Sequence, residues 1–374
     1  MIPTRNIAMP LALLALAAAP CAAGDQGRHP RDAELQRTLD RVVAAGVPGA
    51  VALVRAGGRT TRLTAGYGAL RSKRPMRAGD RFRVGSITKS FVATVVLQLV
   101  AERRLALEDP VARWLPGLVP DGERITVRQL LNHTSGLFAF GADRDFVTQA
   151  SRDPLRVWAP REIIAIATAH PPMFAPGAGW SYSDTNYFVL GLIVERVTGR
   201  PLAAEIERRI LAPLRLRATT LQAGPDIAGP HAHGYFLRPL QDVTVGSPSV
   251  QWAAGALVSD ADDVARFFRA LLGGRLVRPD LLAVMQTTVA APQLGPGTGY
   301  GLGLLRVREP CGALWGHTGA SPGYVADALN SRSGKRQVVV LANATGSLSG
   351  AGLFGLPPRA ARAVDRLTRI ATCP

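Results

Sequence analysis

Lysine is almost absent from this chain, although its net charge is strongly positive. The 374 residues carry a formal charge of +17, yet Lys73, Lys89 and Lys335 are the only lysines. Arginine supplies nearly all of the positive charge, and the arginines are scattered rather than gathered in a basic run with interleaved aromatic residues. Nucleic-acid binding is therefore not expected, whereas attraction to an anionic cell-wall polymer stays open.

Long hydrophobic runs are missing beyond the first residues. No later segment offers the roughly 20 consecutive apolar residues that a membrane-spanning helix needs. The N-terminal stretch combines Arg5, an apolar core over residues 7–19, and small residues before a cleavage point after Ala23. This pattern predicts a signal peptide over residues 1–23. We therefore expect a secreted or periplasmic mature chain without a transmembrane segment.

Cysteine is scarce as well. The chain has three cysteines, and removal of the predicted signal peptide takes Cys21 away and leaves Cys311 and Cys373. In an oxidising compartment these two can form one disulfide. Such a bond would tie the C-terminal tail to the strand near residue 311. Two free thiols are the alternative.

The pattern of apolar residues changes twice along the chain. A helix and short strands with Gly-rich turns come first, helices follow, and strands return before a last helix. The clearest expected helices cover residues 32–45, 86–104, 126–132, 184–198, 260–272 and 358–371, and the expected late strands cover 298–308, 312–319, 323–330 and 336–343.

This order predicts an α+β fold, an α/β sandwich. Its antiparallel sheet is flanked by helices and built from both termini, residues 24–85 and 276–374. A mostly helical domain, residues 86–275, is inserted between the two parts. Ser86 then lies at the junction of the domains, where sites tend to form.

The segment "GSITKSFVATVVLQLV" begins a buried helix with a hydroxyl and an ammonium. Ser86 and Lys89 are three residues apart, so their side chains share one helix face. Ser86 as a helix cap and Lys89 as a surface residue with a buried stem are the structural alternatives. The functional interpretation is that Lys89 takes the proton of Ser86 and makes its oxygen nucleophilic.

Two further segments favour the functional interpretation. "YSD", residues 182–184, stands just before an expected helix, and "HTG", residues 317–319, stands on an apolar strand. With "SITK" before them, the sequence resembles the penicillin-recognising serine hydrolases. These include D-alanyl-D-alanine carboxypeptidases, class C β-lactamases and their esterase and D-aminopeptidase relatives. The resemblance covers roughly residues 32–345 and implies a β-lactamase/transpeptidase-like fold and no cofactor.

The resemblance also implies roles for individual residues. Ser86 is the expected acylated nucleophile. Lys89 and Tyr182 are the expected proton-transfer pair, with Tyr182 as the base once its phenol has lost its proton near Lys89. The backbone N–H groups of Ser86 and Ala320 would form the oxyanion hole. The expected substrate-binding residues are Asp184, His317, Thr318, Gly319 and Ala320.

Two positions depart from the family pattern. Asp184 replaces the more familiar asparagine, and a carboxylate cannot donate to a substrate amide as asparagine can. Asp184 is instead expected to hold Lys89 in its charged form. His317 stands where many relatives have lysine. We expect Thr318 and His317 to face a substrate carboxylate, with His317 strengthening binding only when it is protonated.

Three other features are set aside. "GASPG", residues 319–323, matches the nucleophile elbow of α/β-hydrolases, but Pro322 has no N–H for the oxyanion hole. His231 and His233 lack a third ligand at a suitable spacing, so no metal site is expected. His133 is interpreted as structural.

These observations predict an exported serine hydrolase that acts through an acyl-enzyme. A D-alanyl-D-alanine carboxypeptidase-like activity, with acylation by penicillins, is the first expectation. An esterase, a weak β-lactamase and a non-catalytic wall-binding or penicillin-binding module are the alternatives. The expected partner is a small peptide, β-lactam or ester, including a peptidoglycan stem peptide, and the chain is expected to be a monomer.

Overall fold

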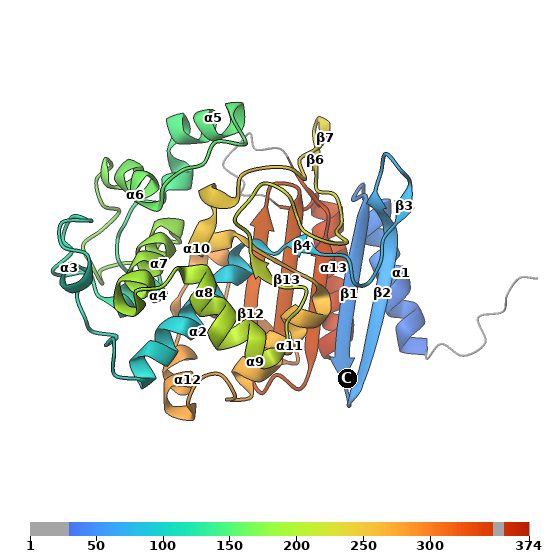
Figure 1. The fold of residues 1–374 in the computed structure, drawn as a ribbon. Helices are drawn as coiled ribbons and strands as arrows, with labels where there is room; N and C mark the ends of the chain where they lie inside the picture. Colours follow the sequence, from blue (N-terminus) through green and yellow to red (C-terminus); the bar gives the residue numbers. More distant parts are fainter. Residues whose placement is uncertain (1–29, 347–354, 374) are drawn as a thin grey trace, which may run out of the picture.

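A nine-stranded antiparallel sheet forms the centre of the molecule (Figure 1). The computed structural model describes residues 30–346 and 355–373, so the predicted signal peptide lies outside the described residues. Strand order in the sheet is β3-β2-β1-β14-β13-β12-β11-β10-β9. The strands are β1 Gly49–Ala56, β2 Arg59–Ala69, β3 Arg74–Pro75, β9 Val289–Ala290, β10 Gly299–Tyr300, β11 Leu305–Glu309, β12 Gly312–Ser321, β13 Tyr324–Ser331 and β14 Gln337–Ala342.

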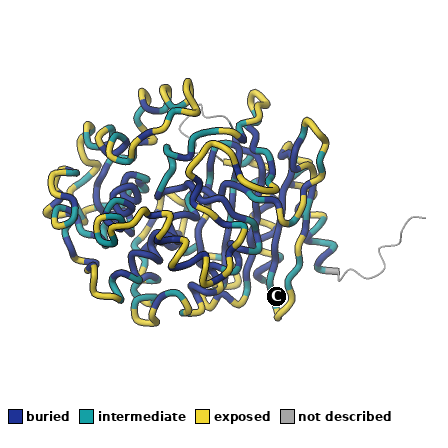
Figure 2. The backbone as a smooth tube through the Cα atoms, in the orientation of Figure 1, coloured by how far each residue is buried: buried dark blue, intermediate teal, exposed yellow. Residues whose placement is uncertain are grey.

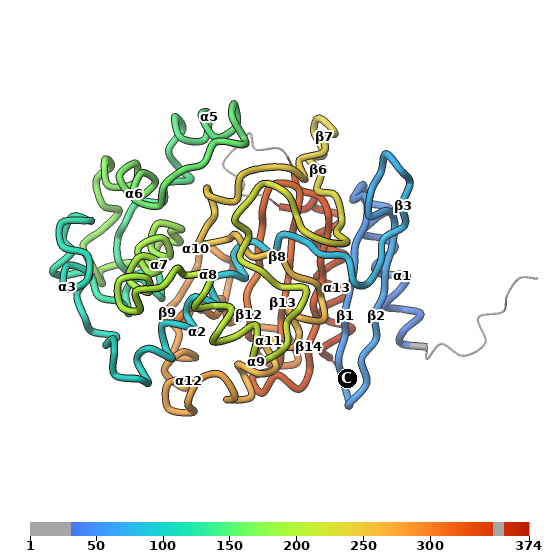
Figure 3. Tube along the Cα trace, viewed as in Figure 1, coloured from blue at the N-terminus to red at the C-terminus, as the bar shows by residue number. Residues whose placement is uncertain are grey.

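The two ends of the chain meet in this sheet. β1 pairs antiparallel with β14, and Leu53 lies opposite Val339. In Figure 3 the blue N-terminal strands therefore stand beside the red C-terminal ones. This arrangement confirms the predicted α+β fold with a sheet built from both termini.

Helices α1 (Pro30–Ala44) and α13 (Pro358–Thr372) pack together on one face of the sheet. Their apolar stripes, with Leu39 and Leu367 fully buried, form a separate core against that face. A disulfide joins Cys311 to Cys373, with their Cα atoms 5.4 Å apart, and is the pairing that the sequence predicts. It fixes the end of α13 beside the start of β12.

The opposite face of the sheet carries the larger core (Figure 2). Helix α2 (Thr88–Ala101) is buried along most of its length and runs through this core, which is the usual place for a helix so rich in apolar residues. The other helices are α3 Val111–Trp114, α4 Val127–Leu131, α5 Arg144–Arg152, α6 Pro160–Thr168, α7 Asp184–Thr198, α8 Leu202–Ile206, α9 Ala212–Leu214, α10 Trp252–Gly255, α11 Ala261–Leu272 and α12 Pro279–Met285.

Short elements complete the fold. Single turns are η1 Gly85–Ile87, η2 Phe140–Ala142, the π-helical η3 Glu207–Leu211, η4 Pro248–Val250 and η5 Pro292–Leu294. Two small sheets contain β4 Phe82–Arg83, β8 Leu257–Ser259 and β5 Thr220–Leu221, and β15 Ala344–Thr345, β6 Tyr235–Leu237 and β7 Leu240–Asp242. Within the described residues, no helix is both long and apolar enough to cross a membrane.

The expected elements differ from the observed ones in three places. The helix expected over 86–104 starts with the 3₁₀ turn η1 and ends at Ala101. The strand expected over 298–308 is two strands, β10 and β11, because residues 301–304 turn between them; Gly303 has a φ of +73° there. Helix α11, inside the expected helical segment 86–275, packs on the sheet against β14 and β1.

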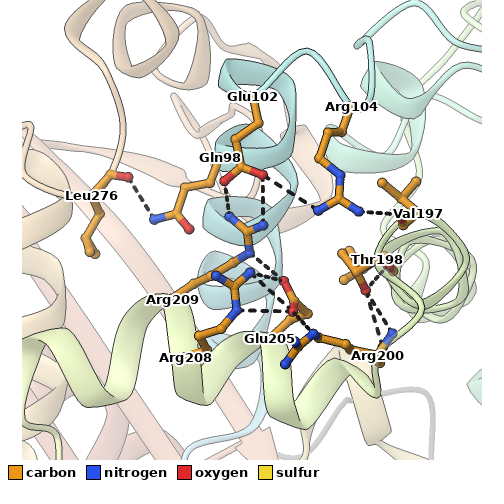
Figure 4. A network of polar contacts seen from close by, with 11 residues as sticks. Gln98, Glu102, Arg104, Val197, Thr198, Arg200, Glu205, Arg208, Arg209 and Leu276 are labelled. Carbon is orange, nitrogen blue, oxygen red and sulfur yellow. Dashed lines mark hydrogen bonds and ion pairs between the residues drawn. The ribbon is translucent and has the colours of Figure 1, made fainter.

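A polar network fixes the C-terminal end of α2 (Figure 4). Arg209 of η3 donates to both carboxylate oxygens of Glu102, at 2.5 and 2.9 Å, and to Glu205 at 2.5 Å. Gln98 donates to the carbonyl of Leu276 at 2.9 Å. The far end of the helix that carries Lys89 is therefore held by buried and half-buried charges.

Candidate active site

Ser86 and Lys89 meet where η1 continues into α2. Lys89 Nζ donates to Ser86 Oγ at 2.9 Å and to the carbonyl of Ala254 at 2.8 Å, and lies 2.6 Å from Asp184 Oδ1. The Lys89 side chain is fully buried. Ser86 is not a cap, because no side-chain cap bond closes either η1 or α2. The structural alternatives for this pair are therefore not observed.

Two opposing effects act on the charge of Lys89. Burial disfavours the ammonium and lowers the pKa of Lys89, while the neighbouring Asp184 carboxylate raises it; burial is the larger effect, and the pKa is lowered overall. A lysine whose pKa is lowered has more free amine at neutral pH. The free amine can accept the proton of Ser86.

Tyr182 is a second neighbour of Ser86. Burial raises the pKa of Tyr182 well above its ordinary value, and the charge of Asp184 raises it further, although a hydrogen bond with Ser86 acts in the opposite direction. Lys89 Nζ lies 5.0 Å from the centre of the Tyr182 ring. Tyr182 is therefore a neutral phenol in the resting enzyme, which does not favour its expected role as the base.

His317 is buried, with 2% of its surface exposed. Its Nδ1 bonds to the backbone carbonyl of Thr318 and must donate, so in the neutral ring Nε2 accepts from the Tyr300 hydroxyl at 2.8 Å. Burial lowers the pKa of His317 to about 3, and Lys89 contributes in the same direction. His317 is neutral near pH 7, which argues against its expected role as a cation that binds a carboxylate.

Strand β12 approaches η1 very closely, and two glycines allow it. A Cβ on Gly319 would overlap the carbonyl oxygen of Val84 and lie 2.9 Å from the backbone nitrogen of Ser86. A Cβ on Gly85, whose φ is +51°, would lie 2.5 Å from the backbone nitrogen of Ala320. The backbone nitrogens of Ser86 and Ala320, the expected oxyanion hole, are thereby brought to one edge of the site.

Thr318 is exposed and lies directly opposite Asp327 of β13. Residues opposite one another in an antiparallel pair place their side chains on the same face. Burial raises the pKa of Asp327 to about 7, and the charge of Asp365 on α13 adds to this effect. A carboxyl group with a pKa of about 7 is uncharged for much of the neutral range, so Asp327 supplies neither a cation for a substrate carboxylate nor a fixed negative charge beside Thr318.

Sequence reasoning missed two contributors. Tyr300, fully buried on β10, is hydrogen-bonded to Nε2 of His317, and the Ala254 carbonyl accepts from Lys89. A lone tyrosine before a Gly-rich turn carries no recognisable signal, and a backbone carbonyl carries none at all. Only the tertiary packing brings them to the site.

Two of the three features set aside in the sequence lie elsewhere, whereas His133 lies beside Tyr182. The hydroxyl of Ser321 is buried and donates to Gln251 at 2.8 Å. His233 pairs with Asp242 at 2.7 Å, and His231 bonds to the carbonyl of Gly229. In the part of the chain that the structure describes, no group of three or more histidine, cysteine or acidic residues is arranged to hold a metal ion.

Comparison with known proteins identifies the family of this chain. Residues 35–353 match the family model described as Beta-lactamase. The chain belongs to the β-lactamase family. This confirms the family predicted from the three motifs, and with it the β-lactamase/transpeptidase-like fold.

Several members of the β-lactamase family are close relatives. Esterase EstB of Burkholderia gladioli is 34% identical over 291 residues, which cover 68% of this chain and 74% of that protein. The solved structure of a D-stereospecific amidohydrolase from Streptomyces sp. superposes with a TM-score of 0.79 at 42% identity, covering 84% of this chain and 94% of that one. D-amino acid amidase from Ochrobactrum anthropi SV3, complexed with L-phenylalanine amide, has a TM-score of 0.79 at 28% identity, covering 91% and 98%. The protein is a serine hydrolase.

Proposed function

We propose that this protein hydrolyses small amides and esters of D-amino acids through an acyl-enzyme on Ser86, and that the leaving group carries no carboxylate. The observation that carries the proposal is the burial of His317, which lowers its pKa, together with the contacts of its two ring nitrogens with Tyr300 and Thr318. The "HTG" strand therefore presents no positive side chain to the substrate.

Acylation follows from the contacts of Ser86. The free amine of Lys89 takes the proton of Ser86 Oγ, and the oxygen attacks the substrate carbonyl. The backbone N–H groups of Ser86 and Ala320 stabilise the negative charge that forms on the carbonyl oxygen. Asp184, 2.6 Å from Lys89, stabilises the ammonium that results.

Tyr182 completes the step. As a neutral phenol bonded to Ser86, it donates its proton to the leaving amine or alkoxide, and Lys89 restores that proton. Water then attacks the acyl-enzyme and gives up its proton to the same pair. Ser86 is released with the free acid.

The substrate class is proposed from the relatives. The Streptomyces neighbour is named a D-stereospecific amidohydrolase, the Ochrobactrum neighbour a D-amino acid amidase and the Burkholderia relative an esterase. Carboxypeptidase activity and acylation by penicillins, the first expectations from the motifs, both require a substrate carboxylate. The neutral His317 makes them less favourable than hydrolysis of uncharged donors.

Export is a second part of the proposal. The predicted signal peptide over residues 1–23 supports it, and the Cys311–Cys373 disulfide supports an oxidising compartment. Peptide mapping of secreted material without reduction should recover the linked pair. Recovery of two alkylatable thiols, or an uncleaved N-terminus, would contradict export.

A matched pair of peptides tests the proposed substrate. One ends in D-Ala-D-Ala and the other in D-Ala-D-Ala-amide, so that only the terminal carboxylate differs. The amide is expected to be cleaved at least as fast as the acid, and a D-phenylalanine amide faster than its L-enantiomer. Ser86→Ala, which loses the nucleophile, should lower every rate by several orders of magnitude. A clear preference for the free carboxylate would establish the carboxypeptidase instead.

A further inference from the structure

Both neighbours of Tyr182 in the chain are hydrogen-bonded to one residue, His133. The backbone N–H of Ser181 donates to the carbonyl of His133 at 3.1 Å. The backbone N–H of Ser183 donates to Nδ1 of the His133 ring at 3.2 Å. The ring itself faces Tyr182, with the two ring centres 4.4 Å apart and a tilt of 35°. His133 thus holds the segment before and after Tyr182 and one side of its ring.

The hydrogen bonds fix the tautomer of His133. Nδ1 accepts from Ser183 and lies 3.1 Å from Asn186 Nδ2, while Asn186 Oδ1 accepts from Ser135 at 2.6 Å. The proton is therefore on Nε2. Burial lowers the pKa of His133 well below its ordinary value, so the ring is neutral.

Nε2 of His133 is a buried donor without a hydrogen-bond partner among the described residues. The ring is fully buried and surrounded by aromatic rings, with centres 4.7 Å from Tyr300, 5.5 Å from Tyr187 and 6.0 Å from Trp180. An unsatisfied buried donor costs about 1–3 kcal/mol. A residue chosen only for packing would carry no such donor.

The backbone conformation of His133 is also energetically unfavourable. Its φ is +64°, in the left-handed region, which glycine and asparagine adopt at a lower energetic cost. Strain of this kind persists where the surrounding structure requires the residue, often at an active site. The acceptor at Nδ1 and the ring beside Tyr182 together require histidine here.

We propose that His133 is a positioning residue, which sets the Tyr182 hydroxyl for proton delivery to the leaving group. This inference rests on the proposed acyl transfer at Ser86, but not on the identity of the substrate. His133 acts through Tyr182 and need not contact the substrate. The importance of Tyr182 rises with the basicity of the leaving group, because a weakly basic group departs without a proton. Displacement of Tyr182 should therefore slow poor leaving groups most.

Three variants separate the contributions of His133. His133→Phe keeps a ring but removes the acceptor for Ser183, so Tyr182 should shift. His133→Asn places a carbonyl oxygen near the position of Nδ1 and tolerates a positive φ, so it should restore much of the activity. Tyr182→Phe removes the hydroxyl and shows the largest loss of rate that the absence of this proton donor can cause. Circular dichroism and thermal unfolding report whether each variant is folded.

The test is a series of substrates that share one acyl group and differ in leaving group. 4-nitrophenyl, phenyl and alkyl esters and an amide cover increasing basicity. His133→Phe is expected to lower kcat for the amide by about 10–100-fold, as misplacement of a proton donor does, and to leave the 4-nitrophenyl ester within about threefold of the wild type. His133→Asn should lie between His133→Phe and the wild type on the amide.

Two results would overturn the proposal: equal slowing of all leaving groups by His133→Phe, or no slowing at all. If that variant does not fold, Asn186→Ala, which removes the other contact of Nδ1, should give the same trend on a smaller scale; a flat response would count against the proposal. A wild type that cleaves esters but no amide would defeat the proposed amidase activity alone. The ester series would still decide the role of His133.

Discussion

The ammonium of Lys89 lies 2.6 Å from the carboxylate of Asp184, where α2 packs against α7. Lys89 is fully buried, whereas 40% of the Asp184 side chain is exposed. The carboxylate therefore stabilises the charge of Lys89 while it keeps contact with solvent. This contact offsets part of the lowering of the Lys89 pKa that burial causes. The pKa of Lys89 in turn governs the pH at which Ser86 becomes a nucleophile.

The first prediction concerns this contact. Asp184 raises the pKa of Lys89, so Asp184→Asn should lower that pKa further below its ordinary value. The amine then stays unprotonated down to a lower pH, so the acidic limb of kcat/KM should move to lower pH. The measurement is a pH–rate profile with an uncharged ester, and Asp262→Asn, on a distant surface ion pair, is the control. An unmoved limb would show that Asp184 does not tune Lys89.

The second prediction concerns the close approach of β12 to η1. Gly319→Ala would push its Cβ against Val84 and Ser86, so the N–H groups of Ser86 and Ala320 should separate. Loss of oxyanion donors costs about 100–1,000-fold in kcat, and a loss of at least tenfold is expected here. Gly79→Ala, whose Cβ would meet nothing within 4 Å, controls for the general effect of adding a methyl group to a glycine without a positive φ. Equal effects of the two changes would contradict the prediction.

Much of this site could be predicted from the sequence. The spacing of Ser86 and Lys89 on one helical turn fixes their contact locally, and three ordered motifs identify the family. The protonation of His317 could not be predicted, because it depends on burial by the whole fold and on the charge of Lys89, which is far from His317 in the sequence. The contacts of His133 could not be predicted either, because only tertiary packing brings Ser181 and Ser183 within reach of its hydrogen bonds. From the sequence alone, His133 is therefore interpreted as structural.

The third prediction concerns the network at the far end of α2 (Figure 4). Arg209 has 5% of its side chain exposed and contacts Glu102 and the fully buried Glu205. Arg209→Met leaves Glu205 short of a buried partner, so the free energy of unfolding should fall by about 3 kcal/mol. Arg208→Met is the matched control, because Arg208 also contacts Glu205 but is 51% exposed; it should cost at most about 1 kcal/mol.

Urea unfolding of both variants, beside the wild type, measures the difference. Because Ser86 lies at the opposite end of α2, kcat on an uncharged ester should change little in either variant at a temperature where both are folded. Equal stabilities of the two variants would mean that the burial of Arg209 contributes nothing. A large fall in kcat without a fall in stability would mean that the network acts on the site instead.

The last prediction concerns His317 and tests whether the "HTG" segment of β12 presents a positive charge to the substrate. The pKa of His317 is lowered to about 3, so the ring stays neutral through the whole range from about pH 5 to pH 9. The ratio of acylation rates for a penicillin and an uncharged ester should therefore show no inflection from His317 over this range. Lys89 and Tyr182 act on both substrates, so their titration largely cancels in the ratio.

Two substitutions complete this test. His317→Gln removes the titratable ring and should leave the pH dependence of the ratio unchanged. His317→Lys introduces an amine beside Tyr300; where that amine is protonated, it should raise the ratio in favour of the penicillin, because a substrate carboxylate then meets a cation. The amine is near the buried Lys89, so this gain should be largest at low pH. An inflection near pH 6.5 in the wild type that disappears in His317→Gln would show that His317 does carry a proton in the working enzyme. Protonated His317 could then bind a substrate carboxylate, as the carboxypeptidase interpretation requires. The preference for uncharged leaving groups would lose its physical basis.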